Sequence, residues 1–217
     1  GCYDDTAVFF FSDHGIYAGD FNLVDINQNT FEDVQTRVPF IIKPPVSVTA
    51  VPGIKEPLVE LVDFPATVYD MTGIDPGYWH FGKSLIPLIQ GETDAHRDAV
   101  FSEGGRLQGE QHCMELEYEP GHKDPADIYF PRLSLQASEE GEHTKAVMCR
   151  TEDYKYVMRL YEQDELYDLK KDPLEQNNVI SSQDYIAVLQ SIKERLLRFF
   201  LETCDAVPFE IDKRNTE

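Results

Sequence analysis

The sequence is 217 residues long and 41% hydrophobic, so it can bury a core without disulfide staples. Its 40 acidic residues outnumber 19 basic ones, and the formal charge of -21 opposes binding to a nucleic-acid backbone or to anionic lipid. We therefore expect a globular protein with no nucleic-acid and no membrane partner, and no apolar run approaches the length of a membrane span.

The first predicted element is a strand over residues 6–11, TAVFFF, a run of β-branched and aromatic residues without polar alternation. Such a run is typical of a strand buried on both faces of a parallel sheet. It ends abruptly in Asp13 and His14. Because ligands bind at the carboxyl ends of strands in open α/β sheets, both side chains are candidate site residues. The alternative is a turn capped by Asp13, with His14 simply exposed.

Further elements of the same kind follow along the chain. Val38 to Ile42 forms a second apolar strand, which the prolines at 44 and 45 end. A helix is predicted from Asp63, as its N-cap, to Gly73. The segment GKSLIPLIQGE then predicts a short helix or turn. Residues 1–100 therefore read as part of an α/β sheet domain.

The sequence pattern changes after residue 100, where glycines and acidic residues replace the periodic apolar segments. An irregular stretch from Gly104 to about Ser138 is typical of a functional or disordered loop. Three strands are predicted within TKAVMCRTEDYKYVMRLYEQDELYDL, with TED and QDE as turns. The segment DYIAVLQSIKERLLRFFLETC carries apolar residues at helical spacing, so we expect a long helix that covers one face of this meander. Residues 101–217 are thus predicted to be a small α+β subdomain.

The cysteines are scattered and include no CxxC pair: Cys2, Cys113, Cys149 and Cys204. This spacing is typical of thiols rather than of a disulfide framework or a zinc site. Thiols favour a reducing compartment such as the cytoplasm, although the sequence does not fix the location.

Five fragments, in this order, resemble the sulfatase family, a branch of the alkaline-phosphatase-like superfamily: SDHG after a strand, TRVPFIIKPP, LVDFPATVYDMTGI, GKSLIPLIQGE and DELYDLKKDPLEQNNVI. The resemblance runs from the first strand to about Ile180 and is to the C-terminal portion of such an enzyme. It implies an α/β fold class: the C-terminal part of an alkaline-phosphatase-like sheet domain, followed by the small α+β subdomain with its meander and long helix.

The resemblance also implies a role for the opening motif. Asp13 and His14 would be two ligands of the divalent metal that holds the sulfate group. Calcium is the family's usual metal, but an imidazole nitrogen also suits manganese or another transition ion. Two ligands cannot complete the coordination of a hard cation, so the others are expected in the N-terminal half of the same enzyme.

The family's nucleophile is a formylglycine made from the first residue of a Cys/Ser-x-Pro-x-Arg motif, and this sequence contains no such motif. The resemblance places the formylglycine in an N-terminal part, so the chain is expected to be a fragment that is inactive alone. Its expected partners are the N-terminal half and a small sulfated substrate, and an oligomer stays open.

One feature departs from the family. Many sulfatases carry a sulfate-binding Lys or Arg between the SDHG segment and the RVP strand, whereas none lies between Gly15 and Arg37 here. By register the position corresponds to Ile26. The candidate substrate-binding residues that remain are Arg106, His112, His143 and Lys145. Each is also typical of a solvated loop or strand end.

The main hypothesis is therefore metal-dependent hydrolysis of a sulfuric ester. The nearest alternative is a phosphodiesterase or phosphonate hydrolase of the same superfamily, which uses a similar metal dyad. The third is a non-catalytic packing or interaction module. An upstream Cys/Ser-x-Pro-x-Arg motif would indicate a sulfatase, and a Thr or Ser nucleophile without that motif would indicate phosphoryl transfer. The absence of both would indicate a pseudoenzyme.

Overall fold

The computed structural model describes residues 1–26, 29–107, 110, 124–130 and 144–205. The chain forms two compact units built from interleaved segments. The first contains residues 1–8, 43–100 and the described part of 193–217, and the second contains residues 9–42 and 101–192. The division into residues 1–100 and 101–217 stays a prediction.

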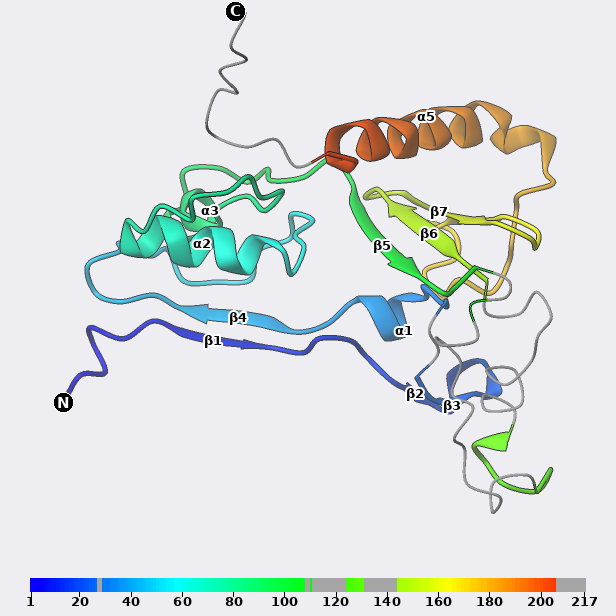
Figure 1. The fold of residues 1–217 in the computed structure, drawn as a ribbon, viewed down its shortest axis with the longest axis horizontal. Helices are drawn as coiled ribbons and strands as arrows, with labels where there is room; N and C mark the ends of the chain where they lie inside the picture. Colours follow the sequence, from blue (N-terminus) through cyan, green and yellow to red (C-terminus); the bar gives the residue numbers. More distant parts are fainter. Residues whose placement is uncertain (27–28, 108–109, 111–123, 131–143, 206–217) are drawn as a thin grey trace, which may run out of the picture. The chain divides into compact units, whose positions relative to one another are not determined.

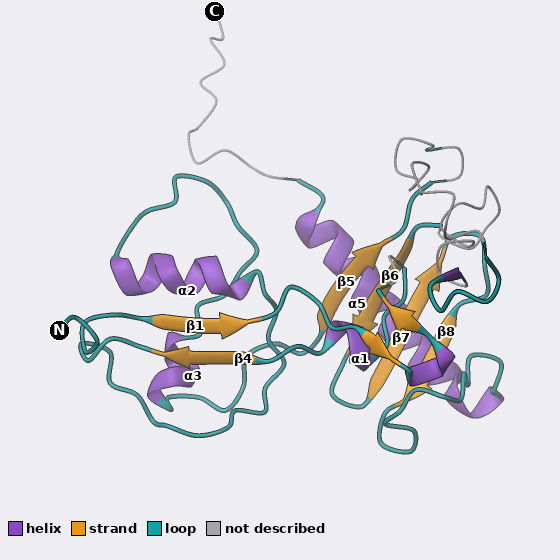
Figure 2. Cartoon of the chain, turned by 90° about the horizontal axis from the view of Figure 1, so that it is seen from below, coloured by secondary structure: helices purple, strands orange, loops and turns teal. Residues whose placement is uncertain are grey.

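The first part of the chain mixes short strands and helices, and four consecutive strands then precede the C-terminal helix (Figures 1 and 2). The strands are β1 (Val8–Phe11), β2 (Tyr17–Ala18), β3 (Val24–Asp25), β4 (Phe40–Lys43), β5 (Val100–Gly104), β6 (Ala146–Arg150), β7 (Tyr154–Arg159) and β8 (Glu165–Asp168). The helices are α1 (Asp33–Thr36), α2 (Asp63–Thr72), α3 (Ile86–Gln90) and α5 (Ile186–Thr203), with 3-10 turns η1 (Asp20–Asn22) and η4 (Gln183–Tyr185).

The two predicted apolar strands are confirmed as β1 and β4, which pair with each other in a two-stranded sheet. They run in opposite directions (Figures 1 and 2), and Phe11 meets Phe40 edge-on with ring centroids 5.6 Å apart. The expectation of parallel strands is wrong for this pair, and within this chain alone Phe10 is 61% and Ile41 62% exposed. An apolar run indicates a hydrophobic strand, but it fixes neither the strand's direction nor what covers it.

The predicted meander is confirmed as β6, β7 and β8, joined by antiparallel pairing. Cys149 lies opposite Tyr156, and Tyr156 lies opposite Leu166; all three are fully buried. A fourth strand, β5, extends the sheet in the order β5-β6-β7-β8. Sequence analysis missed β5 because the glycines that follow FSE indicated a loop.

The long C-terminal helix is confirmed as α5. Ile192 and Leu196 are buried, whereas Leu197 is 59% exposed, as an amphipathic helix requires. Tyr185, just before the helix, contacts Tyr154 of β7 edge-on at 6.3 Å. Coverage of the whole meander face by this helix stays a prediction.

Asp63 plays a different part from the one predicted. The helix α2 does begin at Asp63, and Gly73, with the left-handed φ of 66°, is its C-cap, but the N-cap position is Val62. The Asp63 carboxylate is fully buried and accepts hydrogen bonds from the backbone N–H groups of Glu60 at 2.9 Å and Lys83 at 2.7 Å.

Two side chains complete the shell around this carboxylate. His96 Nε2 lies 3.0 Å from Asp63 Oδ2, and Arg97 Nε donates to the same oxygen at 3.0 Å. Burial raises the pKa of Asp63, but Arg97 and the backbone N–H groups of Lys83 and Glu60 outweigh it, so the pKa lies below its ordinary value. The predicted N-cap role is wrong, because Val62 holds the N-cap position and the carboxylate of Asp63 binds Arg97, His96 and the backbone of Glu60 and Lys83 instead.

Among the described residues, no helix combines the length and apolarity needed to span a bilayer. Cys2 and Cys204 are exposed thiols, and Cys149 is a buried one, as expected from their scattered spacing. Cys113 lies outside the described residues.

Candidate metal and substrate site

Asp13 and His14 follow the end of β1 and lie in a tight turn. The Ser12 hydroxyl donates to the carbonyl of His14 at 2.7 Å, and the backbone N–H of His14 donates to Asp13 Oδ1 at 3.0 Å. The side chain of Asp13 is 84% exposed and that of His14 46%. Both side chains therefore lie exposed at the strand end, an arrangement that fits the proposed metal pair and also the alternative of a turn capped by Asp13.

The carboxylate of this pair suits a cation. The backbone N–H of His14 and then the attraction of its ring lower the pKa of Asp13, so the carboxylate is ionised at neutral pH. His14 Nδ1 lies 2.8 Å from the carbonyl of Gly15. Because a carbonyl only accepts, Nδ1 carries the proton and Nε2 keeps its lone pair in the neutral ring.

The two donor atoms can bind one divalent ion. His14 Nε2 and Asp13 Oδ2 are 3.7 Å apart. Carboxylate oxygens and imidazole nitrogens bind divalent metals at about 2.0–2.6 Å, so one ion can reach both atoms. The donor set thus fits a divalent metal. Within the part of the chain that the structure describes, no group of three or more His, Cys, Asp or Glu side chains could hold one.

The loop that carries the pair rests on α1. The backbone N–H of Gly15 donates to the carbonyl of Gln35 at 2.7 Å. A Cβ at Gly15 would lie 2.0 Å from the carbonyl oxygen of Val34, so the contact requires glycine. Two residues further on, the hydroxyl of Tyr17 donates to the carboxylate of Glu32, just before α1.

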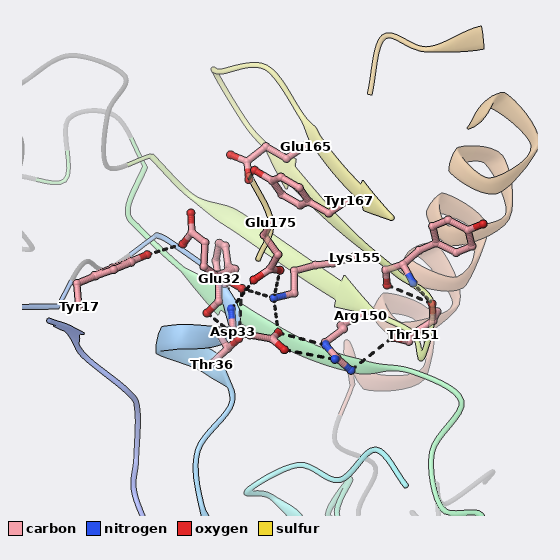
Figure 3. Close-up of polar contacts among 12 residues, drawn as sticks. Tyr17, Glu32, Asp33, Thr36, Arg150, Thr151, Lys155, Glu165, Tyr167 and Glu175 are labelled. Atoms are coloured by element: carbon pink, nitrogen blue, oxygen red, sulfur yellow. Dashed lines mark hydrogen bonds and ion pairs between the residues drawn. The ribbon is translucent and has the colours of Figure 1, made fainter. Parts of the chain in front are cut away.

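A buried cluster of charges holds the other side of α1 (Figure 3). The fully buried Lys155 of β7 donates to Asp33 Oδ1 at 2.6 Å and forms an ion pair with Glu175. Glu175 Oε2 in turn accepts the backbone N–H of Asp33 at 2.6 Å. Arg150 of β6 adds two contacts of 3.3 Å to the carboxylate of Asp33.

Burial and ion pairing act in opposite directions on the two carboxylates of this cluster. Burial raises the pKa of Asp33, but Lys155 and Arg150 overcome it, so the pKa lies below its ordinary value. For Glu175 burial dominates over the attraction of Lys155, and the pKa is raised.

The structure places two of the four predicted substrate-binding residues. Arg106 is buried, at 5% exposure, and its carbonyl accepts the backbone N–H of Lys145 at 2.8 Å. The side chain of Lys145 is exposed. Their backbones are therefore neighbours, and a role in substrate binding stays a prediction for both. His112 and His143 lie outside the described residues.

Sequence reasoning missed the charge cluster and its link to the site. A signal was present, because Lys155 interrupts the apolar strand segment YKYVM, where a buried lysine needs an acidic partner. Its partners could not be inferred, since Asp33 and Glu175 are far from it along the chain.

Family models match two parts of the chain. Residues 1–74 match the model described as Sulfatase, and residues 106–201 match the model described as N-sulphoglucosamine sulphohydrolase, C-terminal. The two matches together include the strand-end pair, Arg106 and Lys145, and the buried charge cluster.

Individual proteins are similar over most of the chain. It is 28% identical over 211 residues to a multifunctional alkaline phosphatase superfamily protein of Trinickia caryophylli, covering 94% of this chain and 36% of that protein. It is 27% identical over 200 residues to an ulvan-active sulfatase of Formosa agariphila, covering 90% and 36%.

Among solved structures, the phosphonate monoester hydrolase of Agrobacterium radiobacter superposes with a TM-score of 0.71 at 26% identity, covering 97% of this chain and 40% of that one. The chain thus spans between 36% and 40% of the length of these three proteins.

Proposed function

The chain belongs to the sulfatase family of the alkaline phosphatase superfamily, and we propose that it serves as the C-terminal portion of a metal-dependent hydrolase of sulfate esters. The observation that carries this proposal is the pairing at the end of β1. There an ionised carboxylate and an imidazole with an available Nε2 lone pair lie 3.7 Å apart.

In this proposal Asp13 and His14 hold the metal. Its charge, when bound, neutralises the anionic oxygens of the substrate. The carbonyl of Gly15 keeps the proton on Nδ1 and thereby orients Nε2 toward the ion. Calcium suits the carboxylate, while the imidazole also admits manganese. The remaining metal ligands and a formylglycine nucleophile are proposed to come from an N-terminal part.

The substrate also needs a cation from the protein. No Lys or Arg occurs between Gly15 and Arg37, so this cation has to come from elsewhere. Of the two described candidates, Lys145 suits the role better, because its side chain is exposed whereas that of Arg106 is buried. An ammonium at this position would stabilise the charge on the leaving group or on the sulfate oxygens.

Phosphonate monoester hydrolysis is the second candidate. It is favoured by the similarity to the Agrobacterium radiobacter phosphonate monoester hydrolase and to the multifunctional Trinickia protein. Both reactions place an anionic tetrahedral group on a divalent metal, so the strand-end pair serves either one.

The test compares two substrates in the full-length protein that contains this chain. We expect 4-nitrophenyl sulfate to be hydrolysed with a higher kcat/KM than a phenylphosphonate monoester. Asp13→Ala removes the charged ligand, and loss of the metal's contribution should lower either activity by about a thousandfold or more.

Asp205→Ala, which removes a carboxylate at the far end of the described chain, is the control and should change neither rate. A faster phosphonate reaction would favour the second candidate. Absence of both activities in metal-supplemented protein would indicate a non-catalytic module.

A further inference from the structure

The ammonium of Lys155 is completely buried, and it binds residues of α1 and its entrance as well as Glu175. It donates to the carbonyl of Phe31 at 2.8 Å and to Asp33 Oδ1 at 2.6 Å, and it pairs with Glu175. The carboxylate of Glu175 is 2% exposed. Lys155 and Glu175 therefore both bind the backbone of the segment that leads into α1.

Stability alone does not explain a cluster of this kind. Buried ion pairs lose much of their Coulomb attraction to desolvation, and well-packed apolar side chains often replace them at no loss of stability. What an apolar group cannot do is bind a backbone carbonyl and a backbone N–H at fixed positions. Lys155 and Glu175 do this for Phe31 and Asp33 respectively.

The helix α1 is too short to be stable without tertiary contacts. α1 has four residues, which is about one turn, and a single turn is far below the length at which an isolated helix is stable in water. Its only described basic neighbours in the cluster are Lys155 and Arg150. These contacts therefore act together with the buried Phe31, which lies in a core cluster with Ala146, Met148 and Val157 at the entrance to α1.

The residues Val34 and Gln35 of α1 contact the strand-end loop. Gly15, next to His14, donates to Gln35 at 2.7 Å and leaves no space for a side chain against Val34. The carbonyl of Gly15 also sets the tautomer and orientation of His14. A shift of α1 would therefore move Gly15, whose carbonyl orients the imidazole of His14.

We propose that Lys155 and Glu175 are positioning residues, which fix α1 and, through Gly15, the orientation of Asp13 and His14. This inference rests on the proposed function, because it assigns a purpose to the placement of the metal pair. Neither residue touches metal or substrate in this arrangement. The path consists of contacts within one compact unit.

The first experiment measures amide hydrogen exchange in the metal-free full-length protein. Lys155→Met keeps the length of the side chain and removes the charge, so we expect peptides containing Gly15 to exchange about tenfold faster. Lys170→Met is the matched control, since Lys170 forms only an exposed ion pair with Asp153 at 2.6 Å. It should leave this exchange unchanged.

Variants of Glu175 separate positioning from charge. Glu175→Gln keeps an oxygen that can accept the N–H of Asp33, whereas Glu175→Ala removes it. We expect Glu175→Ala to behave as Lys155→Met does and Glu175→Gln to restore most of the protection. Equal exchange in both variants would overturn the positioning role. These variants also test the path if Lys155→Met does not fold.

The second experiment measures Mn²⁺ affinity by electron paramagnetic resonance in the same protein. Lys155→Met and Gly15→Ala should each weaken binding about tenfold, and the double variant should be no weaker than the weaker single one, because both act on one path. If the double variant binds Mn²⁺ about a hundredfold more weakly, the two residues act independently and the cluster has only a structural role. The same conclusion follows if Lys155→Met lowers the Tm but leaves the Mn²⁺ affinity unchanged.

The two proposals fail in different ways. If Asp13→Asn leaves Mn²⁺ affinity unchanged, the metal assignment is wrong, whatever Lys155→Met does. If Asp13→Asn abolishes binding but Lys155→Met alters neither the exchange of Gly15 nor the affinity, the metal assignment stands and the positioning role is wrong.

Discussion

At the residue scale, one backbone carbonyl decides which nitrogen of His14 is available. The hydrogen bond of 2.8 Å from Nδ1 to the carbonyl of Gly15 leaves the lone pair on Nε2, beside Asp13, available for a metal ion. A ligand oriented in this way is tuned by a neighbour that does not touch the metal. The identity of the ion then depends on whether this second donor is nitrogen or oxygen.

We predict that His14→Asn changes the metal preference of the full-length enzyme. Asparagine offers a neutral oxygen, which a hard ion such as calcium accepts, whereas manganese loses a nitrogen that it binds well. After chelation, the ratio of calcium-supported to manganese-supported kcat should rise about tenfold. Equal fractional losses with the two ions would argue against His14 as a ligand.

The buried carboxylate of Asp63 provides a prediction for stability. Asp63→Asn removes one of the two carboxylates paired with Arg97 and leaves only Glu60, at 2.9 Å, so urea unfolding at pH 7 should show a loss of about 1.5–3 kcal/mol. The control is Asp98→Asn. The pair of Asp98 with Arg195 is 2.7 Å long, but its carboxylate is 69% exposed, so that loss should be about 1 kcal/mol or less.

The same variant has a defined pH dependence. The pKa of Asp63 in the folded protein lies below its ordinary value of 3.8, so its stabilising effect is complete above that value. It is lost as the pH falls through the folded pKa. The stability difference between wild type and Asp63→Asn should therefore be constant from about pH 5 to 7 and shrink below about pH 4. A difference that grows on acidification would contradict the assignment.

At the scale of elements, hydrophobic pattern predicted the parts whose side chains pack locally. The strands β1, β4, β6, β7 and β8 and the helix α5 are where the apolar runs and the helical spacing indicate them. The pattern could not give β5, whose glycine-rich end indicates a loop, or α1, whose single turn is held by Lys155 and Glu175. Elements held by distant polar partners carry little local signal.

The two faces of α5 should respond differently to the same substitution. Leu196 is 2% exposed, so Leu196→Ala should lower the free energy of unfolding by about 2–5 kcal/mol. Its neighbour Leu197 is 59% exposed, and Leu197→Ala should change stability by about 0.5 kcal/mol or less. Urea unfolding checks both. Similar losses in the two variants would mean that the helix is buried on both faces.

At the scale of the whole molecule, the sequence indicated the strand-end position of Asp13 and His14, which we propose as metal ligands, but not the contacts that support α1 behind them. Asp13 and His14 were predicted because they end an apolar strand in a motif that resembles a family. The support of α1 by β6, β7 and the segment around Glu175 arises only when residues more than 100 positions apart meet.

The number of metal ligands that the chain supplies limits what it can do alone. Two side chains cannot fill the coordination sphere of calcium, which takes six to eight oxygen ligands. We therefore predict that residues 1–217, purified by themselves, hydrolyse no aryl sulfate and bind divalent metal only weakly. Calorimetry that gives tight, stoichiometric calcium binding by this chain would contradict the prediction.

The most direct test of the central assignment is a crystal structure of the full-length protein grown with Mn²⁺, with the metal located by its anomalous scattering. The account predicts a single strong peak about 2.0–2.3 Å from both a carboxylate oxygen of Asp13 and Nε2 of His14, with Nδ1 still donating to Gly15. A peak bound elsewhere, with Nε2 of His14 hydrogen-bonded to protein, would contradict it.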